Sequence, residues 1–195
     1  MRNVAILIFD EVEVLDFCGP FEVFSAAGRQ RNEMPFSVCT VAEASRPVLT
    51  RNQLSVNPRY TVLDCPPPDI LVVPGGRGTR QEMNNSIMID WIKATALRSE
   101  LVLSVCTGAL LLAKAGLLDG LRATTHHGAL DLLREVAPKT EVLANQRVID
   151  NGKVIVSAGI SAGIDGAFHV VTRLLGKEEA METARYMEYD LRDEW

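Results

Sequence analysis

Cys106 stands at the junction of an apolar strand pattern and a helical pattern, where α/β proteins place nucleophiles. It follows the run Leu101–Val105, and Thr107 and Gly108 lead into the expected helix. This strand–turn–helix context is that of a nucleophile elbow, although the G-x-S-x-G form is absent. The helix N-terminus would stabilise a thiolate there, and Cys106 would then be the fastest of the cysteines to alkylate. The alternative is a small, buried, inert cysteine.

Asp16 is the carboxylate that we expect to exchange a proton with this sulfur. It lies in an apolar stretch just before Gly19-Pro20. Burial and a neighbouring thiolate would raise the pKa of such a carboxyl, so that it stays protonated and donates a hydrogen bond to sulfur. The simpler alternative is that Asp16 caps the N-terminus of a helix. Glu22 and Asp10 are competing candidates.

The glycine cluster Gly75-Gly76-Arg77-Gly78 follows a second buried strand pattern, Ile70–Val73. It is either a simple tight turn or a place where backbone N–H groups meet negative charge on a substrate. In the second case, the N–H groups of Gly76 and Thr107 would stabilise that charge, with Gly75 beside the pocket. The cluster matches neither a phosphate loop nor a dinucleotide fingerprint, which disfavours nucleotide binding.

The three histidines and four cysteines have no metal-ligand spacing, so we expect no metal site. His126 and His127 follow a short strand pattern. Either one of them caps or packs locally while the other is solvated, or His126 lines the pocket near Cys106. His169 lies within a helical pattern and is expected to be structural. The cysteines are expected to be free thiols in a reducing compartment.

Short apolar runs alternate with helical patterns along the chain, which predicts an α/β fold: a mostly parallel sheet with helices on both faces. The expected strands are 4–9, 36–41, 70–73, 101–105 and 123–125, with a hairpin of 147–150 and 154–157, and edge strands or a hairpin within 48–60. The expected helices are 21–27, 87–97, 109–115, 130–136, 164–175 and 178–189. No composition break divides residues 1–195, so we expect a single domain.

Composition excludes several classes of partner. The 195 residues are 47% hydrophobic and 23% charged, as in ordinary globular domains. The net charge is −5 with no basic stripe, which argues against nucleic acid. The apolar run after Arg2 is too short for a signal peptide, and no run reaches the roughly 18 residues needed to span a bilayer. We therefore expect a cytoplasmic protein that binds no membrane.

Five motifs in this order resemble the ThiJ/PfpI superfamily. They are L-D-F-C-G-P-F-E-V-F at 15–24, V-P-G-G at 73–76, C-T-G-A at 106–109, A-T-T-H at 123–126 and G-I-S-A-G-I-D at 159–165. The resemblance implies a flavodoxin-like three-layer sandwich, related to class I glutamine amidotransferases, with a cysteine on the elbow. It also implies a homodimer and no cofactor. The last motif would bring Ile160 and a helix N-terminus to the pocket.

Within the superfamily, Asp in L-D-x-x-G-P and Thr after the cysteine are similar to the isonitrile hydratase branch. The resemblance implies that Cys106, Asp16 and Thr107 add water to an isonitrile, through a thioimidate on Cys106, to give an N-substituted formamide. The protease branch has His after the cysteine, and the Parkinson's-associated branch has Glu at the position of Asp16. Two further functions stay open: glyoxalase- or deglycase-like chemistry on small oxoaldehydes, and a non-catalytic redox or metabolite sensor. Similar domains precede the helix-turn-helix of AraC-type regulators, but we expect a free-standing relative.

Overall fold

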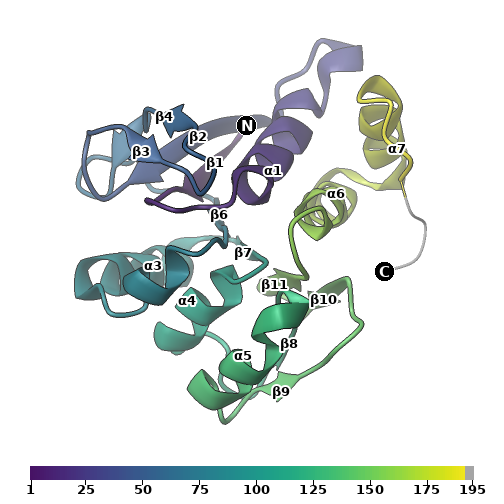
Figure 1. The fold of residues 1–195 in the computed structure, drawn as a ribbon. Coiled ribbons are helices and arrows are strands. Elements are labelled where there is room, and N and C mark those ends of the chain that lie inside the picture. Colours follow the sequence, from purple (N-terminus) through teal and green to yellow (C-terminus); the bar gives the residue numbers. More distant parts are fainter. Residues whose placement is uncertain (192–195) are drawn as a thin grey trace.

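A seven-stranded sheet forms the centre of the computed structural model, which describes residues 1–191 (Figure 1). The strand order is β10-β11-β7-β6-β1-β2-β5, and every neighbouring pair is parallel except β10 with β11. The strands are β1 (Arg2–Leu7), β2 (Phe36–Ala42), β5 (Tyr60–Thr61), β6 (Ile70–Val73), β7 (Leu101–Val105), β10 (Val148–Asp150) and β11 (Val154–Ser157). The parallel sheet predicted from the sequence is confirmed.

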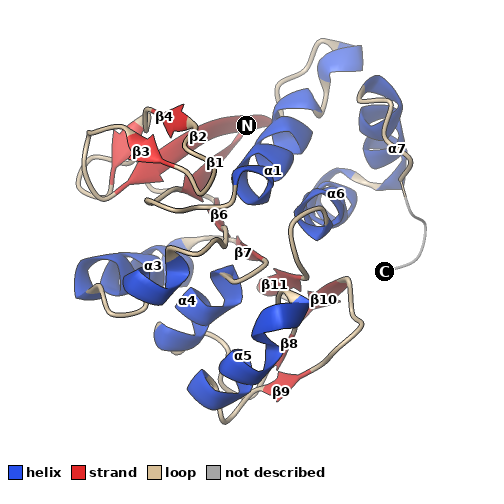
Figure 2. Cartoon of the chain, viewed as in Figure 1, coloured by secondary structure: helices blue, strands red, loops and turns tan. Residues whose placement is uncertain are grey.

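Helices cover both faces of this sheet, which gives the predicted three-layer sandwich (Figures 1 and 2). One layer contains α1 (Val14–Ala26), α6 (Ala162–Leu175) and α7 (Lys177–Tyr186). The other contains α3 (Ser86–Arg98), α4 (Gly108–Lys114) and α5 (Leu130–Val136), with the short α2 (Thr79–Glu82) against α4. Two 3₁₀ turns are η1 (Arg29–Arg31) and η2 (His127–Ala129). None of the helices in residues 1–191 has the length and apolar character to cross a membrane.

Two small sheets lie outside the main one. A hairpin joins β3 (Val48–Leu49) to β4 (Ser55–Val56), so the segment 48–60 supplies both the hairpin and the edge strand β5 that were expected as alternatives. The expected strand 123–125 is shorter: β8 (Arg122–Ala123) pairs with β9 (Glu141–Val142), a strand that was not predicted from the sequence.

Strand β7 and helix α6 approach each other closely at the end of the sheet where Cys106 lies. Every residue of β7 is buried, as expected for a central strand covered on both faces. A Cβ at Gly163 of α6 would lie only 2.6 Å from Val105 Cγ1, so glycine permits this contact. The close packing brings the start of α6, with Ile160 just before it, to the elbow.

Helix α1 begins earlier than the sequence predicted. The expected helix 21–27 used Gly19-Pro20 as its start, but the helix runs from Val14 and holds Pro20 inside it. Burial of Phe17 and Pro20 against the core outweighs the hydrogen bond that proline cannot donate. Asp16 therefore lies in the first helical turn and is not the N-cap residue, which is Glu13.

Candidate functional site

Cys106 occupies a strained turn between β7 and α4, as the sequence predicted. Its φ of +56° is in the left-handed region, which a non-glycine residue enters only when its surroundings hold it there. The Thr125 hydroxyl donates to the Cys106 carbonyl at 2.7 Å, and the Cys106 N–H donates to the Ala158 carbonyl at 3.0 Å. A Cβ at Gly108 would lie 2.0 Å from the Val73 carbonyl oxygen, so only glycine allows the turn to close. Contacts with Thr125, Ala158 and the end of β6 thus hold the elbow in its conformation.

The sulfur of Cys106 is almost enclosed, with 5% of the residue exposed. Burial, together with the negative charge of Asp16, raises the pKa of the thiol to about 12. The backbone N–H groups of Ile160 and Thr107 donate toward the sulfur and lower its pKa, but by less. The resting group is therefore a thiol, and the thiolate expected from the helix N-terminus is not the stable form.

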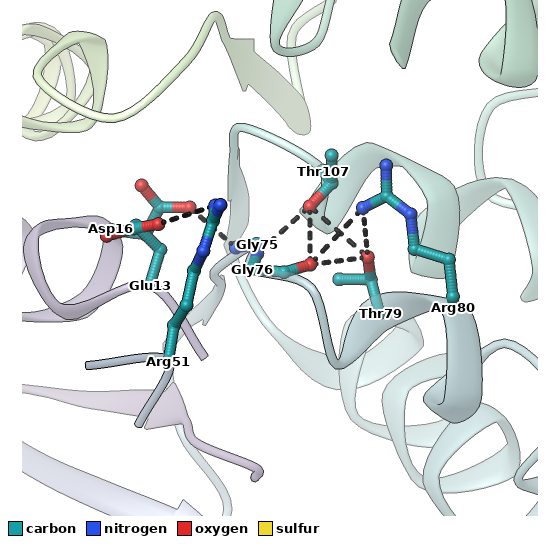
Figure 3. Close-up of polar contacts among 8 residues, drawn as sticks. All are labelled: Glu13, Asp16, Arg51, Gly75, Gly76, Thr79, Arg80 and Thr107. Atoms are coloured by element: carbon teal, nitrogen blue, oxygen red, sulfur yellow. Dashed lines mark hydrogen bonds and ion pairs between the residues drawn. The ribbon is translucent and has the colours of Figure 1, made fainter. Parts of the chain in front are cut away.

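Asp16 lies beneath the elbow and is fully buried. Its Oδ2 accepts a hydrogen bond from the Gly75 N–H at 3.0 Å (Figure 3). Burial raises its pKa to about 7, although the Cys106 thiol and the Gly75 N–H act as hydrogen-bond partners and lower it. Within residues 1–191, Oδ1 has no partner at full hydrogen-bond geometry, so the contact with the thiol is looser than a formed bond. Burial thus raises the pKa of Asp16 as predicted, but the further rise expected from Cys106 is not found, because Cys106 lowers this pKa.

The two competing carboxylates lie elsewhere. Asp10 accepts hydrogen bonds from Arg46 Nη2 at 2.6 Å and from the Leu49 N–H at 2.9 Å, beside a separate cavity. Glu22 is exposed on α1. Neither lines the cavity next to Cys106, whereas Asp16 acts directly on the Cys106 thiol from behind it.

A cavity of about 320 Å³ opens above Cys106. It is lined by Glu13, Arg51, Gly76, Arg77, Arg80, Cys106, Thr107, His126, Gly128 and Ile160. The predicted pocket residues Gly76, His126 and Ile160 are therefore brought together with Cys106. Gly75 does not line the cavity; its N–H donates to the buried Asp16 carboxylate. Glu13 and the three arginines were not predicted from the sequence, because they come from surface loops and helix starts.

Gly76 does not offer the free N–H group that was expected. Its N–H donates to Thr107 Oγ1 at 2.9 Å, and this hydroxyl donates to the Gly76 carbonyl at 3.1 Å (Figure 3). Thr79 Oγ1 also donates to that carbonyl, at 2.8 Å. The Thr107 hydroxyl satisfies a buried N–H that would otherwise be unpaired. The N–H groups available at the sulfur are those of Thr107 and Ile160.

His126 both caps a turn and lines the cavity, so the two roles considered for it hold together. Its Nδ1 accepts from the Gly128 N–H at 3.1 Å, which leaves the ring proton of the neutral form on Nε2. Burial lowers the pKa of His126, and its ring lies 4.3 Å from that of His127. His169 pairs with Asp150 at 2.7 Å, away from the cavity. No cluster of three or more His, Cys, Asp or Glu side chains that could hold a metal occurs in residues 1–191.

Comparison with known proteins gives consistent matches. The model of the DJ-1/PfpI family matches residues 2–173. An isonitrile hydratase of Pseudomonas putida is 35% identical over 188 residues, which cover 96% of this chain and 78% of that protein. A crystal structure of a ThiJ/PfpI family protein from Pseudomonas syringae superposes on the whole chain and on 77% of its own, with a TM-score of 0.88 and 28% identity.

A transcriptional regulator is also similar. The HTH-type regulator GbdR of Pseudomonas aeruginosa is 24% identical over 91% of this chain, which spans only 48% of the regulator. The same domain type therefore occurs both in a protein named as an enzyme and in one named as a regulator.

Proposed function

The chain belongs to the DJ-1/PfpI family, and from this premise we propose that it is an isonitrile hydratase, which adds water to an isonitrile to give an N-substituted formamide. One observation carries the proposal: the buried Asp16 carboxyl, with a pKa of about 7, lies beside the Cys106 thiol on a strained elbow. Such a pair can both form a carbon–sulfur bond and move the accompanying proton. The 35% identity to the P. putida isonitrile hydratase supports the same reaction.

The first step adds the thiol across the isonitrile carbon. Asp16 takes the thiol proton as Cys106 Sγ bonds to the carbon of R–N≡C, and passes that proton to the same carbon. The product is a thioimidate, R–N=CH–S–Cys106, and Asp16 ends the step as it began. Because the carbon gains one proton and one sulfur, the step consumes one S–H group and needs no other reactant.

The second step releases the formamide. Water adds to the thioimidate carbon while a proton moves to the nitrogen, which gives R–NH–CH(OH)–S–Cys106. The C–S bond then breaks, the hydroxyl proton is transferred through Asp16 to sulfur, and R–NH–CHO leaves. The N–H groups of Thr107 and Ile160 stabilise negative charge on the departing sulfur. His126 lines the cavity and, with its proton on Nε2, can donate that proton to the nitrogen.

The raised pKa of Cys106 favours this function over a redox sensor. Sensor cysteines are solvent-accessible and have a low pKa, whereas burial raises the pKa of Cys106 to about 12. A thiol that loses its proton only to Asp16 during addition is protected from oxidants at rest.

Turnover of an alkyl isonitrile tests the proposal. Purified protein should convert cyclohexyl isonitrile to N-cyclohexylformamide, and acid quenching during turnover should trap the adduct on the Cys106 peptide. Cys106→Ala should abolish the product, while Cys18→Ala, a matched change outside the cavity lining, should retain it. Full turnover by Cys106→Ala would end the proposal. Consumption of methylglyoxal in place of isonitrile would favour the glyoxalase-like reaction.

A further inference from the structure

The cavity above Cys106 carries positive charge that a neutral isonitrile group does not require. Arg51, Arg77 and Arg80 line it, against one acidic lining residue, Glu13. The whole chain has a net charge of −5, so this local excess opposes the overall sign. Arg51 comes from the turn between β3 and β4, whereas Arg77 and Arg80 flank the start of α2.

Most of this charge is not neutralised by protein groups. Arg51 Nη1 lies 3.4 Å from Glu13 Oε2, a long ion pair between partly exposed groups. Arg80 Nη1 donates to the Gly76 carbonyl at 3.3 Å and to Thr79 Oγ1 at 3.1 Å, and both acceptors are neutral. Arg77 forms no ion pair or side-chain hydrogen bond with any residue of the described chain. Among residues 1–191, the guanidinium groups of Arg77 and Arg80 thus have no carboxylate partner.

Two of the arginines flank Gly76 and Thr107, the latter being the residue after Cys106 (Figure 3). Figure 3 shows Arg51 and Arg80 on opposite sides of Gly76 and Thr107. Both arginines lower the pKa of His126, in addition to the larger effects of burial and His127, and Glu13 opposes them only weakly. At His126, the positive charge of these two arginines therefore outweighs the negative charge of Glu13.

We propose that this cavity selects small anionic substrates. For the reaction itself this inference rests on the proposed function, so the substrate is an isonitrile that also carries a carboxylate. Arginine binds carboxylates through paired N–H donors. Arg77 and Arg80 bind the anionic group, while the isonitrile carbon reaches Cys106 at the base. The volume of about 320 Å³ is at the lower end for ligand sites and suits a small molecule.

Isocyanoacetate and its methyl ester are a matched pair for the test, because they differ mainly in the negative charge. The wild-type protein should show a higher kcat/KM for isocyanoacetate than for the ester. Arg77→Gln should reduce the ratio of the two constants about two- to fivefold, the effect of one charge a few ångströms away in a wet site. Arg98→Gln, at the exposed end of α3, is the control and should leave the ratio unchanged.

Alkylation of Cys106 separates this inference from the hydratase reaction. Iodoacetate is anionic and iodoacetamide is neutral, and peptide mass spectrometry gives the rate of each at Cys106. The iodoacetate-to-iodoacetamide rate ratio should exceed that of 2-mercaptoethanol, and it should fall in Arg77→Gln and with added salt. If neither isonitrile is consumed but this ratio is raised, anion selection stands without the hydratase function. If the ratio equals that of 2-mercaptoethanol, or if the ester is the better substrate, anion selection is wrong.

Discussion

Asp16 and Cys106 shift each other's pKa in opposite directions. The Asp16 carboxylate raises the pKa of the Cys106 thiol, while the thiol, as a hydrogen-bond partner, lowers that of Asp16. The pair holds one proton between a pH of about 7 and a pH of about 12, and that proton rests on sulfur. Since the two groups are coupled, changing either one changes the chemistry of the other.

Asp16→Asn separates sulfur reactivity from catalysis. The variant removes the negative charge beside Cys106, so the pKa of the thiol should fall and iodoacetamide should label Cys106 faster at pH 8. Hydration of the isonitrile should nevertheless fall by about 10²-fold or more, because proton transfer is lost. Peptide mass spectrometry and product assays measure the two effects. If the rate of Cys106 labelling and the rate of hydration fell by the same factor, the role of Asp16 would be structural and not catalytic.

The rate of hydration should rise through a pH of about 7 and then level off. Below that pH, both groups of the pair are protonated, and sulfur cannot pass its proton to Asp16. Above it, the carboxylate is free to accept that proton, and the thiol does not ionise until a pH of about 12. A pH series of kcat/KM measures this ionisation. A rate that instead decreases above pH 7 would assign the reaction to the doubly protonated pair.

Asp16 should also make the stability of the protein depend on pH. Folding raises its pKa from 3.8 to about 7, so the folded state binds the proton more tightly and the free energy of unfolding falls as pH rises through this range. The effect is at most about 4 kcal/mol. Asp16→Asn should therefore be more stable than wild type at pH 8, with a smaller difference at pH 5. Urea unfolding at both pH values measures it, with the exposed Asp90→Asn as control.

Gly75→Ala should damage the site directly. A Cβ there would lie 2.4 Å from the Thr107 amide nitrogen and 2.9 Å from Asp16 Oδ2. We expect a loss of stability of about 1–3 kcal/mol and a larger loss of kcat. Gly152→Ala is the control, because a Cβ at Gly152 meets nothing within 4 Å although its φ is +84°. It should lower the melting temperature but retain kcat per folded molecule.

Cys39, rather than Cys106, should be the first cysteine to react with iodoacetamide. The neighbouring Cys65 thiol, with a smaller contribution from Arg59, lowers the pKa of Cys39, whereas burial raises that of Cys106. This reverses the order expected from the sequence. Timed labelling at pH 7.5 should modify Cys39 first, and Cys65→Ala should slow this reaction by removing the neighbouring thiol that lowers the pKa of Cys39. Labelling of Cys106 ahead of Cys39 would contradict the order of the two pKa values.

The features of the site that depend on neighbouring residues in the chain could be predicted from the sequence. Cys106 follows a buried strand and precedes a helix, so its elbow could be read from neighbouring residues, and the apolar setting of Asp16 indicated a raised pKa. The occupied N–H of Gly76 could not be predicted, since it depends on the rotamer of Thr107, 31 residues away. Arg51 was missed for a similar reason: its place at the cavity depends on how the β3–β4 hairpin folds over the sheet.

The hairpin has a practical consequence for redesign. Its turn holds Arg51, which contacts the cavity from a small peripheral sheet, whereas Cys106 and Asp16 are fixed by the central strands and α1. Exchanging the Arg51 side chain alone would change the charge at the cavity while keeping the Arg51 N–H, which donates to the Val12 carbonyl at 3.0 Å. Selectivity and reactivity can thus be engineered on separate segments of the chain.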